Sequence, residues 1–352
     1  MKIVLTGGGT GGHVIPALAL VPSLEAAGCQ IHYIGSKDGI EMELAQNANL
    51  PYYPISTGKL RRYIDKKNIS DMFRVVKGIG DAHHYLGKIR PNLVFSKGGF
   101  VTVPVVIAAW LRGIPVIIHE SDLSFGLANK IAGQFAKVIC VSFKETLDSN
   151  KKAVLTGTPI RSELLKGNRE KGLQLTGFRP EKPTALVMGG SGGSASINKA
   201  VVQALPSLTS NFNIIHICGK GNTADIVHKD YIQYEFVTDQ LPHLYALANI
   251  VISRAGANVL AEFLALRKPS LLIPLPKTAS RGDQIQNAKS FADAGYSAVL
   301  EEKLLTTETL GAALQDMYNN RGKYISNMME SPQKDSVTTI VDIIISNKKQ
   351  KQ

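Results

Sequence analysis

Short, mainly apolar runs alternate with longer segments of helical spacing along most of the chain. Runs such as Lys2–Thr6 and Leu93–Ser96 have the length and composition of buried strands. Each is followed by glycines and then by a segment whose apolar residues recur at helical intervals, for example from Val14 to Leu24. This alternation predicts an α/β fold in which a parallel sheet carries helices on both faces.

The pattern starts again near residue 185, which predicts two domains. A length of 352 residues also favours two domains, each with its own core. Strand–polyglycine–helix openings occur at Gly7–His13 and again at Gly189–Ser194. We therefore expect two Rossmann-like, doubly wound domains facing a cleft, with boundaries at 1–160 and 161–335. Residues 336–352 are expected to return to the first domain, and the linker is predicted at 157–180, where Pro and Gly cluster.

The first glycine run contains Gly7, Gly9 and Gly12, which formally satisfy the GxGxxG dinucleotide fingerprint. The next predicted strand, Gln30–Ile34, ends in Gly35-Ser36 and lacks the acid that binds an adenosine ribose. We therefore interpret the first loop as a turn that approaches a phosphate or sugar closely, and not as a nicotinamide site.

Residues 250–288 have the pattern expected of a nucleotide-sugar site. A buried strand (Ile250–Ser253) and a glycine turn precede a helix that carries Glu262. The helix N-terminus offers free N–H groups to an anion, and an acid in its first turns can accept two hydrogen bonds from a ribose diol. A second strand (Ser270–Pro274) leads into a predicted polar loop with Asp283, Gln284 and Asn287. The alternative is an ordinary βαβ unit with a solvated glutamate.

Several side chains at these loops could carry chemistry. His13 and Glu120 are rival candidates for a general base, although each could also be a passive contact or a surface residue. Arg161 could meet a diphosphate or form an interdomain ion pair. Ser191 with Gly192 could cradle phosphate. The run 189–193 also matches the GxSxG nucleophile elbow, which leaves a hydrolase as an alternative.

The sequence contains no DxD motif and no His, Asp or Glu cluster with metal-ligand spacing, so we expect no metal and no cofactor. The three cysteines lie far apart, which fits a reducing cytoplasm. No signal peptide or membrane-spanning run is predicted.

A net charge of +12 requires an anionic partner. The charge is concentrated in residues 59–77, where Arg61, Arg62, Lys66 and Lys67 precede apolar Met72, Phe73, Val76 and Ile79. This combination suits an interfacial helix on an anionic cytoplasmic membrane surface. The alternative is a helix that packs its apolar side into the core. We do not expect nucleic acid as a partner, because no recognised module is present.

These motifs occur together in one order over essentially the whole chain: GGGTGGHVIPALAL, SKGGFVTVPVVIAA, HESDLSFGLANK, TGTPIR, GGSGGS, SRAGANVLAEFLALRKPSLLIPLP and DQIQNA. The chain thereby resembles the MurG family, bacterial enzymes that transfer GlcNAc from UDP-GlcNAc to lipid I in peptidoglycan synthesis. The resemblance implies a GT-B glycosyltransferase fold and an inverting mechanism. It also implies a peripheral position on the inner face of the cell membrane, with cell-wall synthesis proteins as further partners.

The resemblance also implies roles for individual residues. The sugar donor would be contacted by Thr10, Gly11, Gly12, Arg161, Ser191, Gly192, Thr238, Ala257, Asn258, Val259, Leu260, Ala261, Glu262, Gln284 and Asn287. His13 and Glu120 match polar positions of the acceptor site, with Gly98, Gly99 and Phe100 beside them. The chain departs from many family members after the His-Glu pair, where it has Ser121-Asp122, so no donor contact is carried over to that loop.

Three other functions remain open at this point: a UDP-sugar:diacylglycerol glycosyltransferase, a nicotinamide-dependent oxidoreductase and a non-catalytic nucleotide-sugar sensor. The sequence leaves the identity of the base, the acceptor peptide and the oligomeric state undetermined.

Overall fold

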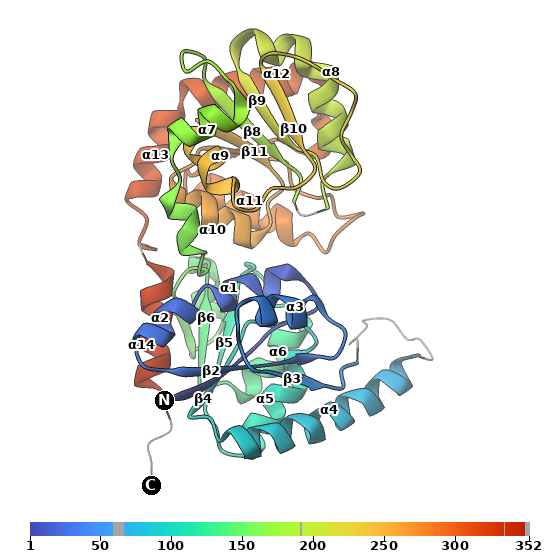
Figure 1. Ribbon diagram of the computed structural model, residues 1–352, viewed down its shortest axis with the longest axis vertical. Coiled ribbons are helices and arrows are strands. Elements are labelled where there is room, and N and C mark those ends of the chain that lie inside the picture. Colours follow the sequence, from blue (N-terminus) through green and yellow to red (C-terminus); the bar gives the residue numbers. More distant parts are fainter. Residues whose placement is uncertain (59–66, 191, 334, 349–352) are drawn as a thin grey trace. The chain divides into compact units, whose positions relative to one another are not determined.

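The computed structural model describes residues 1–58, 67–190, 192–333 and 335–348. The chain divides into two compact units (Figure 1). The first comprises Met1–Arg161 together with Asp335–Gln352, and the second comprises Ser162–Lys334. Each unit is an open parallel sheet with helices on both faces, as the alternating pattern predicts.

The first unit contains a seven-stranded sheet in the order β3-β2-β1-β4-β5-β6-β7, and all described pairs are parallel. The strands are β1 (Lys2–Thr6), β2 (Gln30–Ser36), β3 (Tyr52–Ile55), β4 (Leu93–Ser96), β5 (Val116–Glu120), β6 (Val138–Val141) and β7 (Ala153–Leu155). The helices are η1 (Gly11–His13), α1 (Ile15–Leu18), α2 (Val21–Ala26), α3 (Ile40–Asn47), α4 (Lys67–Ile89), α5 (Thr102–Leu111), α6 (Leu127–Phe135), η2 (Lys144–Ser149) and α14 (Ser336–Ser346).

Two apolar clusters form the core of this unit, one on each face of the sheet. Helices α4, α5 and α6 cover one face, and α2 and α14 cover the other. Helix α14 is the last described helix of the chain, yet it lies beside α2 (Figure 1). Its Ile340, Val341 and Ile344 are buried in the same cluster as Ile3 and Leu5 of β1.

The second unit contains a six-stranded sheet in the order β10-β9-β8-β11-β12-β13. The strands are β8 (Thr184–Met188), β9 (Asn213–Ile217), β10 (Tyr231–Tyr234), β11 (Ile250–Ser253), β12 (Ser270–Leu272) and β13 (Ser297–Val299). The helices are η3 (Ser162–Lys166), α7 (Arg169–Thr176), α8 (Ala195–Asn211), α9 (Leu241–Leu247), α10 (Ala257–Leu266), α11 (Asp283–Asp293), η4 (Glu302–Leu304), α12 (Thr307–Asn319) and α13 (Arg321–Met329).

The strand order of each sheet reverses at one point. The chain moves outward from β1 to β3 and then returns to β4 on the other side of β1, and it does the same around β8 with β11. Ligands of open α/β sheets bind outside the carboxyl ends of the strands at such switch points. The glycine loops after β1, β4 and β8 and the turn after β11 all lie there.

Three sequence-based predictions of elements were wrong. The single helix from Val14 to Leu24 is broken into α1 and α2, because Pro16 and Pro22 each occupy the first turn of a new helix. The linker predicted at 157–180 contains η3 and α7, and α7 packs on α9 in the second unit. The polar loop predicted around Asp283 is instead the start of α11.

Candidate functional site

Three loops of the first unit meet at the switch point of its sheet: Gly7–His13 after β1, Lys97–Phe100 after β4 and the segment from Glu120 to Asn129 after β5. The Gly8 N–H donates to the Gly98 carbonyl oxygen over 3.3 Å. A Cβ on Gly99 would collide with the Gly8 carbonyl oxygen and lie 3.2 Å from Cδ2 of His13. Gly98 and Gly99 also have positive φ angles of 96° and 87°, so glycine is required there for this packing.

Glu120 is buried and is the acceptor of a local hydrogen-bond network. Its carboxylate accepts from the backbone N–H of Asp122 (3.1 Å), the backbone N–H of Gly126 (3.0 Å) and Nδ2 of Asn129 (3.0 Å). Asn129 in turn lies 3.0 Å from the position of a Cβ on Gly98. Burial raises the pKa of Glu120, and the charge of Asp122 adds to that effect. Through Asn129, Glu120 therefore links the segment after β5 to the Lys97–Phe100 loop after β4.

His13 ends η1 and is only partly buried, with its ring edge against Gly99. The neighbouring His119 differs, because it is fully buried and its Nε2 donates to the carbonyl oxygen of Gly157 over 2.8 Å. Burial lowers the pKa of His119 well below its usual value. His119 is thus a neutral core residue. His13 and Glu120 remain the candidate bases, and both lie at the carboxyl edge of the first unit's sheet.

Sequence reasoning missed two buried charges at this edge. Lys97 is buried and donates to Oγ of Ser121, and burial lowers its pKa to about 8 although Glu120 and Asp122 oppose that shift. Glu41 is fully buried and accepts from the backbone of Gly9 and Ser36. The available signal for Lys97 was its place directly after a buried strand. Glu41 gave no signal, because its partners are backbone groups and the hydroxyl of Ser36.

In the second unit, α10 begins at Ala257, and Gly256, which lies two residues beyond the turn entry at Arg254 after β11, caps its N-terminus. Residues Ala257 to Glu262 therefore all lie in the first two turns of this helix. Glu262 is partly buried, and its Oε2 accepts a hydrogen bond of 3.0 Å from the Tyr245 hydroxyl. The helix N-terminus and the glutamate thus have the local arrangement that the sequence predicts.

Gln284 and Asn287 lie in the first turns of α11 and brace the turn that precedes α10. Oε1 of Gln284 accepts from the N–H of Ala255 (3.3 Å) and of Leu275 (3.1 Å). Asn287 is fully buried, and its Nδ2 donates to the Ala255 carbonyl oxygen over 3.3 Å. These contacts position the loops after β11 and β12 relative to each other.

Arg254 is a further residue that sequence reasoning missed. Its buried guanidinium donates to the Ile273 carbonyl oxygen (3.1 Å), Oγ of Ser194 (2.7 Å) and Oγ of Ser196 (3.0 Å), and it pairs with Glu302. Ser194 caps the N-terminus of α8, directly after the second glycine loop. Arg254 therefore joins this loop to the loops after β11 and β12.

The other residues predicted to bind the sugar donor lie at separate places in the structure. Thr238 is exposed just before α9, Thr10 is exposed at the start of η1, and Arg161 is the last residue of the first unit. Ser191, Arg61, Arg62 and Lys66 lie outside the described residues.

Helix α4 begins at Lys67 and presents apolar side chains to solvent near its start. Met72, Phe73 and Val76 are 65, 73 and 61% exposed, while Val75 between them is buried. Ile79 instead packs against the core cluster on this face of the sheet. The prediction of an exposed apolar surface therefore applies to the first three residues, and Ile79 belongs to the inward side of the helix.

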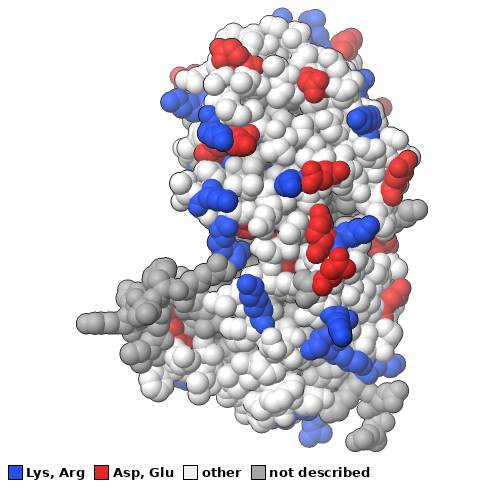
Figure 2. Space-filling model, turned by 180° about the vertical axis from the view of Figure 1, so that it is seen from behind, with Lys and Arg blue, Asp and Glu red and all other residues white. Residues whose placement is uncertain are grey.

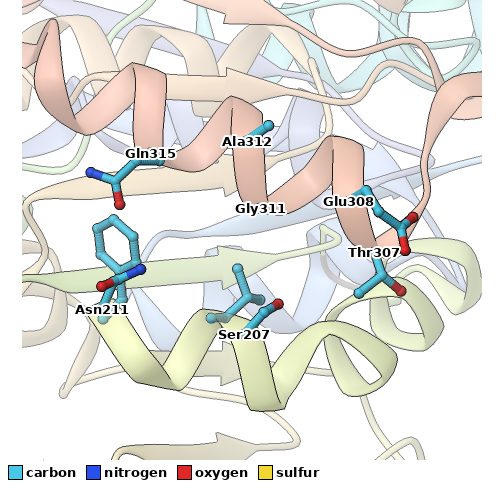
Figure 3. Close-up of a pocket in the computed structure, with 9 residues that line it drawn as sticks. Ser207, Asn211, Thr307, Glu308, Gly311, Ala312 and Gln315 are labelled. Carbon is cyan, nitrogen blue, oxygen red and sulfur yellow. The ribbon is translucent and has the colours of Figure 1, made fainter.

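Other surface features lie away from these loops. A pocket of about 390 Å³ lies between the C-terminal half of α8 and α12 (Figure 3), remote from the carboxyl ends of the strands. Basic and acidic side chains are interspersed on the face shown in Figure 2. Within the described residues, no group of three or more His, Cys, Asp or Glu could hold a metal ion. None of the helices in the described ranges is long and apolar enough to cross a membrane.

Comparison with known proteins defines the class to which this fold and these loops belong. The model of the glycosyltransferase family 28 N-terminal domain matches residues 3–141, and that of the family 28 C-terminal domain matches residues 184–343. The fold is that of GT-B glycosyltransferases. It is shared with a glycotransferase of kitacinnamycin, at a TM-score of 0.74 and 15% identity over 99% of both chains.

The chain also has much nearer relatives. It is 54% identical to the UDP-N-acetylglucosamine–N-acetylmuramyl-(pentapeptide) pyrophosphoryl-undecaprenol N-acetylglucosamine transferase of Lachnospira eligens, over 99% of both proteins. A Clostridium botulinum protein of the same name is 53% identical over 97% of this chain and 98% of its own length. The crystal structure of Acinetobacter baumannii MurG superimposes with a TM-score of 0.76 at 26% identity, over 98% of this chain and 99% of that one. The chain belongs to the family of these transferases, the MurG family.

Proposed function

We propose that this protein transfers GlcNAc from UDP-GlcNAc to the 4-hydroxyl of the MurNAc residue in lipid I, giving lipid II and UDP. The observation that carries the proposal is identity of 54% over almost the whole chain to a transferase with that donor and acceptor in its name. The loops at the switch points of both sheets supply the polar groups that such a reaction needs.

We assign the donor to the second unit. The N–H groups at the start of α10 offer hydrogen bonds to the nucleotide, and Glu262 would accept from the ribose diol. The second glycine loop, with Ser191 and Gly192, would approach the diphosphate, helped by Arg161. Thr238, Gln284 and Asn287 would line the uracil and GlcNAc positions. Thr10, Gly11 and Gly12 of the first unit would approach the donor sugar.

We assign the acceptor to the first unit. His13 or Glu120 takes the proton from the acceptor hydroxyl, and Gly98, Gly99 and Phe100 form the adjacent wall. The deprotonated oxygen attacks the anomeric carbon of GlcNAc in line, and the bond from that carbon to the UDP oxygen breaks. The negative charge passes to the leaving diphosphate, where helix N-termini and arginine stabilise it without a metal ion.

The acceptor lies at a bilayer surface, so the first unit must reach the headgroups. Exposed Met72, Phe73 and Val76 in α4, next to the basic residues of 59–67, suit shallow insertion into an anionic membrane. We therefore propose a peripheral location on the inner face of the cell membrane. Other cell-wall synthesis proteins could meet the enzyme there.

The nearest alternative acceptor is diacylglycerol, and a nicotinamide-dependent oxidoreductase is the alternative of another class. The decisive experiment is a transfer assay with labelled UDP-GlcNAc, in which lipid I and diacylglycerol are offered in parallel. We expect label in lipid II alone. Label in the diacylglycerol product would move the protein to the glycolipid synthases, and UDP-GlcNAc binding without turnover of either acceptor would indicate a sensor. Binding of NADH in place of UDP would support the oxidoreductase.

A further inference from the structure

Glu41 is a buried carboxylate that the reaction outlined above does not use. It lies in the first turn of α3 and is fully buried. One carboxylate oxygen accepts from the N–H of Gly9 over 3.2 Å. The other accepts from the N–H of Ser36 over 3.1 Å and from the Ser36 hydroxyl. Ser36 ends β2, so this side chain joins the end of one strand to the loop that follows another.

Glycines at three positions surround this carboxylate. A Cβ on Gly8 would lie 2.6 Å from its carboxyl carbon, and one on Gly35 would lie 2.8 Å from its Cγ. A Cβ on Gly39 would collide with both carboxylate oxygens. The backbone therefore closes around Glu41 at a distance that only glycine allows. The hydrogen bonds and the closely packed glycines together form a specific binding site for the Glu41 carboxylate.

The position of Glu41 explains why the Gly7–His13 loop has the glycines of the dinucleotide fingerprint although the next strand lacks the acid that should follow it. In a dinucleotide site, an acid at the end of the second strand faces the ribose. Here the end of that strand, Ser36, is engaged by Glu41, whose carboxylate is directed at the protein's own loop. The N–H of Gly9 is consequently occupied by a residue of the chain.

The loop held by Glu41 is the one that carries His13. The Gly7 carbonyl oxygen accepts from the Tyr33 hydroxyl over 2.8 Å, and a Cβ on Gly7 would collide with the His13 carbonyl oxygen. The Gly9 backbone lies against the Phe100 ring, and the His13 ring lies against Gly99. Displacement of Gly9 would therefore disturb His13 and Phe100 together.

We propose that Glu41 is a positioning residue for the acceptor half of the reaction, because it fixes the Gly7–His13 loop, which packs on the loop that follows β4, to the end of β2. This inference rests on the proposed function for the identity of the acceptor. It places the effect of Glu41 in the first unit, so binding of UDP, which lacks the sugar that Thr10, Gly11 and Gly12 are proposed to approach, should be independent of it.

The test compares Glu41→Gln with Glu43→Gln. Glu43 lies in the same turn of α3 but is exposed, so it is a matched control. Glutamine at position 41 loses the charge and turns an N–H₂ toward donors, which removes at least one charge-assisted hydrogen bond. We expect kcat/KM for lipid I to fall on the order of tenfold or more, with the Kd for UDP within about twofold of the parent. Glu43→Gln should behave like the parent.

Gly8→Ala is a second variant that disturbs the same contact without changing Glu41. Its Cβ should push the carboxylate away from Gly9 and reproduce the split between lipid I kinetics and UDP affinity. Hydrogen exchange gives a readout that does not depend on turnover, and in both variants the amides of 7–13 should exchange faster while those of 257–266 stay as in the parent.

Unchanged acceptor kinetics and unchanged exchange in Glu41→Gln would overturn the inference. An equal loss of lipid I kinetics and of UDP affinity, together with a lower melting temperature, would also overturn it, because that result shows a merely structural role. If the parent transfers no GlcNAc to lipid I, the proposed function fails, and exchange of residues 7–13 still decides whether Glu41 holds the loop.

Discussion

The two candidate bases differ in how much of their hydrogen-bonding capacity is already used. The Glu120 carboxylate accepts from two backbone donors within its own loop and from Asn129 of α6, which makes it an anchor for that loop. His13 is partly exposed at the edge where the loops meet. An imidazole also titrates near the pH at which a general base works best, whereas a carboxylate must have its pKa raised. Burial does raise the pKa of Glu120, so the carboxylate stays a rival.

We predict that His13 is the base. His13→Ala should lower kcat strongly and remove the acidic limb of the pH–rate profile, since no group then has to lose a proton for activity. Glu120→Gln should leave the acidic limb in place. If Glu120 were the base, activity would fall as the pH drops through its raised pKa, and this limb would vanish in Glu120→Gln instead. Retention of nearly full kcat and of the limb by His13→Ala would reduce the histidine to a substrate contact.

A second prediction at this scale concerns Glu262. Glu262→Ala should weaken UDP-GlcNAc binding by about 2–3 kcal/mol, because the ribose diol loses two charge-assisted hydrogen bonds. Calorimetric titration with UDP measures the loss. Tyr245→Phe is the matched control, since it removes the hydroxyl that donates to Glu262 but keeps the carboxylate. A folded Glu262→Ala protein with parent affinity would exclude Glu262 from the nucleotide site.

Glycines and single polar residues after strands could be identified from the sequence, because the strand pattern shows which loops share a sheet edge. Glu41 could not be identified in this way, because it follows no strand and binds the backbone of Gly9 and Ser36 and the Ser36 hydroxyl. Arg254 directly follows a predicted strand, but its carbonyl and hydroxyl partners have no sequence signature. Lys97 directly follows a predicted strand, but its burial depends on tertiary packing against Ser121.

At the scale of elements, strands were predicted well because both faces of each sheet are covered, which makes the strands continuous apolar runs. Helix ends were predicted less well. Pro16 and Pro22 were read as parts of one apolar helix, although each begins a new one. The glycines of 157–180 suggested a linker, but Gly167 and Gly172 serve close packing against the backbone of α9.

The third prediction concerns helix α4. Replacing Met72, Phe73 and Val76 by Ser should weaken binding to anionic vesicles and lower transfer to membrane-embedded lipid I, because shallow insertion of exposed apolar groups is lost. A soluble short-chain acceptor should be turned over as before. Val227→Ser is the control, since Val227 is 98% exposed in the second unit. Binding of the parent should also fall at high salt. Parent-like vesicle binding by the triple variant would show that α4 does not contact the membrane.

At the scale of the whole molecule, the chain makes each unit from a repeated strand–glycine–helix scheme, and this repeat was visible in the sequence. The sequence also predicts that residues 336–352 return to the first domain. Residues Asp335–Gln352 belong to the first unit, although the second unit separates them from it in sequence. The apolar residues of α14 require burial, and the structure buries them against α2 and β1.

The last prediction follows from this connection. A chain that ends at Gln333 lacks α14 and so loses the burial of Ile340, Val341 and Ile344 in the first unit. Burial of such a side chain contributes roughly 1.5–3 kcal/mol, so the first unit should lose on the order of 5 kcal/mol. In calorimetry we expect a separate transition to move to lower temperature, while the transition that UDP raises stays in place.

Point variants refine that test without shortening the chain. Ile340→Ala should move the same transition in the same direction by a smaller amount, because it leaves a cavity between α14 and β1. Asp342→Ala, at an exposed position of α14, should have little effect. If truncation instead lowers the UDP-sensitive transition, or both transitions equally, α14 stabilises the second unit as well, and the two units do not unfold independently.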